Sequence, residues 1–203
     1  MSSDQNVQSS KSNQILKVIF VGPSGVGKTS IVNSYIYKDF KVNMNPTISA
    51  SFSSVDIKRD DNTLLTLQIW DTAGQERYFS VSKLFFRDAA VACVCFEVGS
   101  MESISSIPFW TNTVLQESPK CQLIFVGTKS DLITSDQLKT VDELIHDIAS
   151  NEGAKYYIFS SAKTKHNIND IFRSVISLAP QFTKETFYSI SETVNHDSKK
   201  KCC

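Results

Sequence analysis

A segment near the start of the chain, Gly22 to Thr29, constrains the possible folds more than any other feature. Its sequence, GPSGVGKT, matches the pattern G-x-x-x-x-G-K-[ST] and directly follows an apolar run over residues 17–21. The glycines of this pattern let the backbone wrap closely around phosphates, and the loop leads into a helix whose first N–H groups face them. The sequence therefore predicts a strand, a phosphate-binding loop and a helix, in that order.

The same loop supplies the side chains that a nucleoside triphosphate needs. Lys28 is expected to reach the β- and γ-phosphates, and the Thr29 hydroxyl is expected to ligate Mg²⁺. Pro23 lacks an N–H group, but the cradle comes mainly from residues 25–29, so phosphate binding should survive. The backbone and side chains expected around the phosphates belong to Gly22, Ser24, Gly25, Val26, Gly27, Lys28, Thr29 and Ser30.

Further apolar runs predict the rest of the sheet. Their hydrophobicity is nearly continuous, as in parallel strands that are covered on both faces. Amphipathic patterns over residues 141–149 and 168–176 predict helices between and after these strands. Residues 51–70 hold two extended runs around Asp60-Asp61-Asn62, which predicts an antiparallel hairpin. We therefore expect an α/β sheet, mostly parallel with one antiparallel edge. The predicted buried strands are Lys17–Val21, Val91–Val98, Leu123–Val126 and Tyr156–Phe159.

Composition excludes several classes of protein. The chain has 203 residues, with 21 Lys and Arg against 21 Asp and Glu, so it lacks the basic surface of a nucleic-acid binder. It has no apolar run of the roughly 18 residues that a membrane span needs, and its polar start does not resemble a secretory signal. The spacing of its 5 cysteines suits neither a disulfide framework nor a zinc site. We expect a cytosolic protein.

The two ends differ in composition from the middle. Residues 1–14 and 181–203 are rich in Ser, Asn, Thr and Lys and have little apolar periodicity. Such segments bury too little apolar surface to offset the entropy lost on ordering. We expect flexible tails at 1–14 and 181–203 and one globular domain over 15–180.

A second motif, DTAGQER over residues 71–77, follows the hairpin. Together with the phosphate loop it resembles the Ras-superfamily small GTPases, and the resemblance covers Leu16 to about Ala179. It implies a P-loop small-GTPase domain with a six-stranded sheet and helices on both faces. It also implies a GTP- and GDP-binding switch that hydrolyses GTP slowly and regulates vesicle traffic. Features that resemble the Rab branch are LQIW at 67–70, RY at 77–78, FFR at 85–87 and the final Cys-Cys.

The resemblance implies roles around the γ-phosphate and the metal. Phe40 falls where the family packs an aromatic ring against the guanine base. Thr47 falls at the threonine that ligates Mg²⁺ and senses the γ-phosphate, and Asp71 resembles the acid that holds Mg²⁺, usually through a water. Gly74 resembles the glycine whose N–H meets the γ-phosphate. Gln75 resembles the catalytic residue that orients the attacking water.

Base selection is implied for two further segments. Asp131, in Thr128-Lys129-Ser130-Asp131, can accept hydrogen bonds from the N1–H and the amine that guanine has and adenine lacks. Lys129 would lay its methylenes along the ring. Thr128 departs from the asparagine of most family members, which predicts altered nucleotide affinity. The last base-binding loop is expected at Ser161, Ala162 and Lys163.

Other positions also depart from the family. Ser49-Ala50-Ser51-Phe52 stands where Rabs usually show Gly-Val-Asp-Phe, Asp88 replaces a usual glycine, and Gly99 replaces a polar residue. These changes predict divergent partner surfaces. Pro108 lies a few residues into an expected helix, so that helix either starts late, near Ser106, or bends.

The end of the chain, Lys-Lys-Lys-Cys-Cys, resembles a Rab-type double prenylation site at Cys202 and Cys203. Two isoprenoids and a basic patch imply a peripheral protein on the cytoplasmic face of an intracellular membrane that cycles with the cytosol. Phe52, Trp70 and Phe85 match aromatic positions that face effectors. The implied partners are an exchange factor, a GTPase-activating protein, a lipid-masking chaperone and effectors, and we expect a monomer.

Two other functions remain open from the sequence. A degenerate module could hold nucleotide without turnover, a reading that the changes at Ser49 and Thr128 permit and that intact Lys28, Asp71 and Gln75 oppose. A P-loop ATPase or kinase is the other reading, opposed by Asp131 and by the Ser161-Ala162-Lys163 segment.

Overall fold

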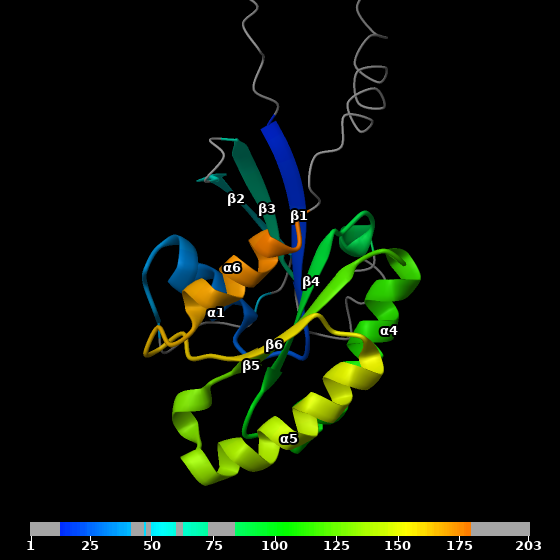
Figure 1. Cartoon of the computed structure of the whole chain (residues 1–203). Helices are drawn as coiled ribbons and strands as arrows, with labels where there is room; N and C mark the ends of the chain where they lie inside the picture. Colours follow the sequence, from blue (N-terminus) through cyan, green and yellow to red (C-terminus); the bar gives the residue numbers. More distant parts are fainter. Residues whose placement is uncertain (1–12, 42–46, 48–49, 60–62, 73–83, 180–203) are drawn as a thin grey trace, which may run out of the picture.

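The six strands of the described residues form one sheet in the order β2-β3-β1-β4-β5-β6 (Figure 1). The computed structural model describes residues 13–41, 47, 50–59, 63–72 and 84–179. Within them, β2 and β3 pair antiparallel, and every other neighbouring pair is parallel. This confirms the predicted sheet with its antiparallel edge strand. The strands are β1 (Asn13–Val21), β2 (Ser51–Lys58), β3 (Leu64–Asp71), β4 (Val91–Glu97), β5 (Gln122–Thr128) and β6 (Tyr156–Phe159).

Helices cover both faces of this sheet, as expected. Figure 1 shows α1 and α6 on one side and α4 and α5 on the other. The helices are α1 (Lys28–Ile36), α3 (Met101–Ser105), α4 (Ile107–Glu117), α5 (Ser135–Glu152) and α6 (Ile168–Ser177), with a 3-10 turn η2 at Ser130–Leu132.

The central strand β1 contributes to two hydrophobic cores. Val18 and Phe20 pack into the cluster that includes residues of α1 and α6. Ile19 and Val21 pack into the other cluster, with residues of α4 and α5. All four are fully buried. Residues 18–21 of β1 are covered on both faces, so neither face offers a polar position there, which explains the continuous apolar run in place of alternation.

The helix boundaries follow local signals in the sequence. The Thr134 side chain accepts a hydrogen bond from the Gln137 N–H group in a capping box, and Gly153 ends α5 at φ 71°, a left-handed conformation that suits glycine. Pro108 lies in the first turn of α4, where its missing N–H group removes no helical bond. The expected helix therefore starts late, after a short α3 that ends at Ser105, and this alternative is correct.

Two details differ from the expected pattern. β1 begins at Asn13, so the sheet includes two residues that the sequence assigned to the N-terminal tail. Asp88, at the position where the family usually has glycine, adopts φ 58°. Aspartate visits this left-handed region more readily than most side chains do, so the backbone shape is kept without a glycine.

The parallel strands place the predicted site at one edge of the sheet. The phosphate loop follows β1, Thr128 ends β5, and Ser161 comes just after β6. Because these strands run in the same direction, their carboxyl ends meet at one edge, which is where α/β sheets bind ligands. No helix in the described part of the chain is long and apolar enough to cross a bilayer.

Candidate nucleotide-binding site

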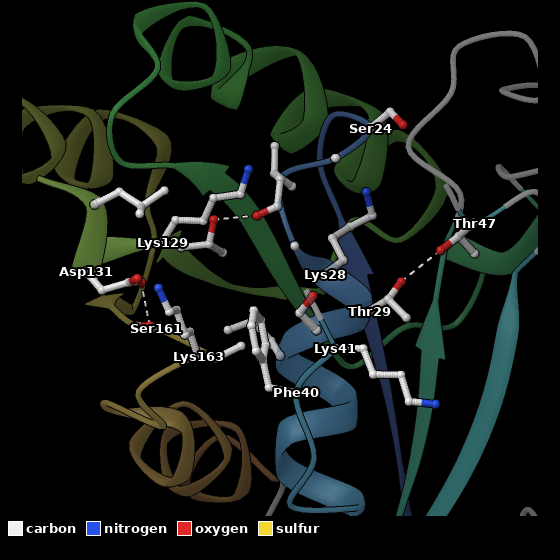
Figure 2. Close-up of a pocket in the computed structure, with 18 residues that line it drawn as sticks. Ser24, Lys28, Thr29, Phe40, Lys41, Thr47, Lys129, Asp131, Ser161 and Lys163 are labelled. Carbon is white, nitrogen blue, oxygen red and sulfur yellow. Dashed lines mark hydrogen bonds between the residues drawn. The ribbon is translucent and has the colours of Figure 1, made fainter. Parts of the chain in front are cut away.

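A cavity of about 420 Å³ opens at this edge of the sheet. Figure 2 shows Lys28, Thr29 and Thr47 on one side of it, Asp131 and Ser161 on the other, and Phe40 below them. Lining residues that the sequence did not single out are Ile31, Lys41 and Leu132. Those that it predicted are Ser24, Gly25, Val26, Gly27, Lys28, Thr29, Ser30, Phe40, Thr47, Thr128, Lys129, Asp131, Ser161, Ala162 and Lys163.

Gly22 was expected at the phosphates, but it does not line the cavity. It lies against β4 at φ 137°, and a Cβ atom there would come within 2.1 Å of the Cys95 carbonyl oxygen. No side chain fits at that distance. The glycine is therefore required by the close approach of the loop to β4, and its carbonyl oxygen faces Lys28.

Lys28 is buried under the loop. Its Nζ atom donates to the carbonyl oxygens of Gly22 at 2.8 Å and of Pro23 at 2.9 Å. Burial lowers the pKa of this ammonium group, and the nearby Asp71 carboxylate opposes the shift. A cation that is removed from water and held by neutral carbonyls has a strong preference for an anionic partner. The arrangement suits a phosphate in the cavity.

Three oxygen-bearing side chains from distant parts of the chain meet beside Lys28. The Thr29 hydroxyl donates to Asp71 Oδ2 at 2.5 Å, and the Thr29 and Thr47 hydroxyls lie 2.8 Å apart. Asp71 is buried, and its other oxygen, Oδ1, has no hydrogen-bond partner among the described residues. Burial raises the pKa of Asp71, against the Thr29 hydrogen bond and the Lys28 charge.

This donor set fits Mg²⁺. All three side chains offer oxygen, which hard divalent cations prefer, and the unpaired Oδ1 of Asp71 is a buried acceptor that a cation or its water would satisfy. The described residues contain no group of three or more His, Cys, Asp and Glu side chains that could hold a metal, and this set combines one carboxylate with two hydroxyls. Thr29, Thr47 and Asp71 are therefore the candidate metal ligands.

The other end of the cavity is built from the loops after β5 and β6. The Ser161 hydroxyl donates to Asp131 Oδ1 at 2.6 Å, and the Ser130 N–H group donates to the Ser160 carbonyl at 3.1 Å. The two loops are thus tied together by both side chains and backbone. This bonding orients the Asp131 carboxylate before any ligand arrives.

Thr128 connects this end to the phosphate loop. Its side chain is buried, and its hydroxyl lies 2.5 Å from the Val26 carbonyl oxygen and 3.0 Å from that of Phe96. Thr128, which departs from the asparagine usual in the family, thus holds the loop after β5, called the base-side loop below, against the phosphate loop.

Three aromatic residues form a cluster on β2, β3 and the segment before β4. The ring centroids of Phe52 and Trp70 lie 5.0 Å apart, and those of Trp70 and Phe85 lie 5.3 Å apart. Phe52 is 51% exposed, while Trp70 and Phe85 are half-buried. Lys17 Nζ lies 5.4 Å from the Trp70 ring centroid, a contact that the sequence did not predict. Phe52, Trp70 and Phe85, the residues predicted to face effectors, therefore lie in contact with one another and are partly exposed to solvent.

Some predicted residues lie outside the described part of the chain. They are the catalytic candidate Gln75, the switch glycine Gly74, the divergent Ser49 and the lipidation candidates Cys202 and Cys203. Their roles stay predictions.

Comparison with known proteins gives concordant results. Residues 17–181 match the family model described as Ras family. The Ras-related protein RABG3b of Arabidopsis thaliana is 35% identical over 176 residues, which cover 84% of this chain and 86% of the relative. The Ras-related protein Rab7 of Cenchrus ciliaris is 33% identical over 191 residues, 92% of each chain. The Ypt/Rab-type GTPase ypt71 of Schizosaccharomyces pombe is 33% identical over 176 residues, 84% of each chain. Every residue that lines the cavity falls within the matched family region.

Proposed function

Because the chain belongs to the Rab branch of the Ras family of small GTPases, we propose that it binds and hydrolyses GTP in the cavity described above. Membership of this family makes it a guanine-nucleotide-binding GTPase that regulates vesicle traffic and acts with regulators and effectors. A module without turnover is not favoured. The observation that carries the site assignment is that Lys28, Thr29 and the Asp131–Ser161 pair line one cavity. Asp71 lies behind Thr29 and accepts its hydrogen bond.

The chemistry of the phosphate side follows from these residues. Lys28 and the loop N–H groups would bind the β- and γ-phosphates, and Thr29, Thr47 and Asp71 would hold Mg²⁺. When bound, Mg²⁺ neutralises charge on the phosphate oxygens. Gly74 contacts the γ-phosphate, and Gln75 orients a water in line with it. Loss of the γ-phosphate removes a partner of Thr47 and of Gly74, and this releases the chain segments around these two residues.

The base side selects guanine. Asp131 accepts hydrogen bonds from the two donors on that edge of guanine, Phe40 packs against the ring, and the Lys129 stem lies along its face. Ala162 offers its N–H group to the guanine oxygen. Ser161 and Lys163 flank this contact, and both line the cavity.

Intrinsic hydrolysis is slow in this proposal. No arginine is among the described residues that line the cavity, so charge developing on the γ-phosphate lacks a guanidinium partner in cis. An activating protein that inserts an arginine would accelerate the reaction by ~10³ to 10⁵-fold. An exchange factor would release GDP so that GTP can bind again. The GTP form would recruit effectors, and the protein would act as a monomer.

Membrane attachment is the remaining part of the proposal. Prenylated Cys202 and Cys203 anchor the chain at the cytoplasmic face of an intracellular membrane, and a lipid-masking chaperone returns it to the cytosol. Stable anchoring needs two lipid groups, here the two isoprenoids, and each contributes ~0.8 kcal/mol per buried CH₂ group. Fractionation of cells tests this, because Cys202→Ser with Cys203→Ser should move the protein into the soluble fraction. Continued membrane association would exclude prenylation as the anchor.

Single-turnover hydrolysis by the full chain tests the catalytic assignment. With Mg²⁺, we expect slow release of phosphate from bound GTP, trapping of the GTP form by Gln75→Leu, and loss of tight nucleotide binding in Lys28→Ala. Excess GTP, but not excess ATP, should displace labelled GDP. Normal hydrolysis by Gln75→Leu in the presence of its activating protein would contradict the role of that residue, and displacement by ATP would contradict the base assignment.

A further inference from the structure

Lys129 is held at both ends. Its backbone adopts φ 58° at the start of η2, a conformation that few residues other than glycine adopt, and its Nζ atom lies 2.6 Å from Oε2 of Glu97. The side chains of Lys129 and Glu97 are 34% and 31% exposed, so the ion pair is partly shielded from water. The backbone and the ion pair therefore constrain the direction of the lysine stem from both of its ends.

The sheet explains how these two residues meet. Glu97 is the last residue of β4 and lies opposite Thr128 in the parallel β4–β5 register, next to Lys129. Its own backbone is fixed, because its N–H group donates to the Ser103 hydroxyl at 2.9 Å and its carbonyl accepts from the Ser100 N–H group at 3.1 Å. The carboxylate thus projects from a rigid strand end.

This ion pair differs from the others in the described part of the chain. Lys139–Asp136 and Arg173–Asp170 each join residues three positions apart on one helix, and their side chains are more exposed. Such pairs contribute little to stability. Lys129–Glu97 instead links two strand ends that are 32 residues apart in the sequence.

Lys129 lines the nucleotide cavity, and Glu97 is not among its lining residues. We propose that Glu97 is a positioning residue for guanine-nucleotide binding, which holds the Lys129 stem in place against the base without touching the ligand itself. The inference rests on the proposed placement of the base over Lys129. A free lysine side chain would lose rotamer entropy when the base binds. Because the ion pair already restricts the rotamers of Lys129 in the folded protein, less entropy is lost on binding.

The expected effect is on nucleotide retention. Because the pair is partly exposed, Glu97→Gln should accelerate the release of GDP from the Mg²⁺-loaded full chain by a moderate factor, ~3- to 10-fold. Glu97→Asp keeps the charge on a shorter side chain, so it should release GDP more slowly than Glu97→Gln. Asp170→Asn, which breaks the exposed pair on α6, is the matched control and should leave the rate unchanged.

A double-mutant cycle separates positioning from a general structural role. Lys129→Met keeps an apolar stem and removes the ammonium group, so Glu97→Gln should have no further effect in that background. The proposal is overturned if Glu97→Gln releases GDP within twofold of the wild-type rate, or if its effect is as large in Lys129→Met as in the wild type. These results are distinct from failure of the proposed function, in which the wild-type chain itself would not retain GDP.

Discussion

The Thr128 hydroxyl oxygen lies 2.5 Å from the Val26 carbonyl oxygen, and this contact joins the base-side loop to the phosphate loop. The same hydroxyl lies 3.0 Å from the Phe96 carbonyl oxygen on β4. A hydroxyl group has one proton, so it donates fully to one of the two carbonyls at a time. A side-chain amide has two donor hydrogens and could serve both.

Replacing this threonine with the residue usual in the family should strengthen the junction. Thr128→Asn is expected to slow the release of GDP by ~3- to 10-fold, since a net hydrogen bond between neutral groups contributes about 0.5–1.5 kcal/mol. Displacement of fluorescent GDP by excess unlabelled GDP measures the rate.

The matched variant for this prediction is Thr128→Val, which keeps the shape of the side chain and removes the hydroxyl. It leaves two buried carbonyl oxygens without this donor, so GDP should leave faster than from the wild type. Equal release rates in Thr128→Val and the wild type would show that the junction does not hold the nucleotide.

Asp131 is expected to determine the base. Asp131→Asn replaces one acceptor oxygen with an amide donor, which suits the carbonyl that xanthine presents where guanine has an amine. We expect the preference for guanosine over xanthosine diphosphate to fall by ~10²-fold or more, because mismatched buried polar groups are heavily penalised. Competition between the two nucleotides measures the preference.

Ser161→Ala provides the control for Asp131. It removes the donor to Asp131 Oδ1 but keeps the carboxylate, so affinity should fall moderately for both nucleotides and their ratio should stay the same. A preference that Asp131→Asn leaves unchanged would place base recognition elsewhere.

The sequence predicted the parts of the site that depend on local motifs. The phosphate loop could be located because glycine spacing, Lys28 and Thr29 act within one strand–loop–helix unit. The late start of α4 was one of two alternatives, and Pro108 alone could not decide between them. The choice depends on the packing of α3 and α4 over β4, which the local sequence does not specify.

Contacts between distant strand ends could not be predicted. The Glu97–Lys129 ion pair depends on the register between β4 and β5, and the Gly22–Cys95 approach depends on how closely the loop lies on β4. Periodicity reports which strands are buried, but not which residues lie opposite each other. Lys41 and Leu132 line the cavity without any motif that marks them.

The buried cysteines should be chemically inert in the folded protein. Burial raises the pKa of Cys95 to about 12, against the charge of Lys28, and raises the pKa of Cys121 to about 12. The pKa of Cys93 is also raised well above its usual value by burial. A thiol with a pKa near 12 is ionised to only about one part in 10⁴ at pH 8, and alkylating agents attack the thiolate.

Iodoacetamide labelling at pH 8 with peptide mass spectrometry tests this directly. We expect unmodified peptides for Cys93, Cys95 and Cys121 in the folded chain and full modification in guanidinium chloride. Rapid labelling of any of the three without denaturant would contradict its burial in the core.

The aromatic cluster is expected to bind effectors. Phe52 is 51% exposed and packs on Trp70, so its ring offers apolar surface that a partner could cover. Trp70→Ala should abolish capture of partners by the GTP-loaded protein with little change in nucleotide affinity, because neither residue lines the cavity. However, Trp70 is half-buried between Phe52 and Phe85, and its truncation also removes core packing.

Phe52→Ala separates recognition from stability, since this exposed ring contributes less to folding. We expect pull-downs with the GTP-loaded variant to lose effectors while its thermal midpoint stays within a few degrees of the wild type. Tyr156→Ala is the matched control, because Tyr156 is also exposed, at 41%, but lies on β6 at the opposite edge of the sheet. Effector capture that survives both Phe52→Ala and Trp70→Ala would assign the cluster to packing alone, whereas its loss in Phe52→Ala but not in Tyr156→Ala would establish the β2–β3 face as the binding surface.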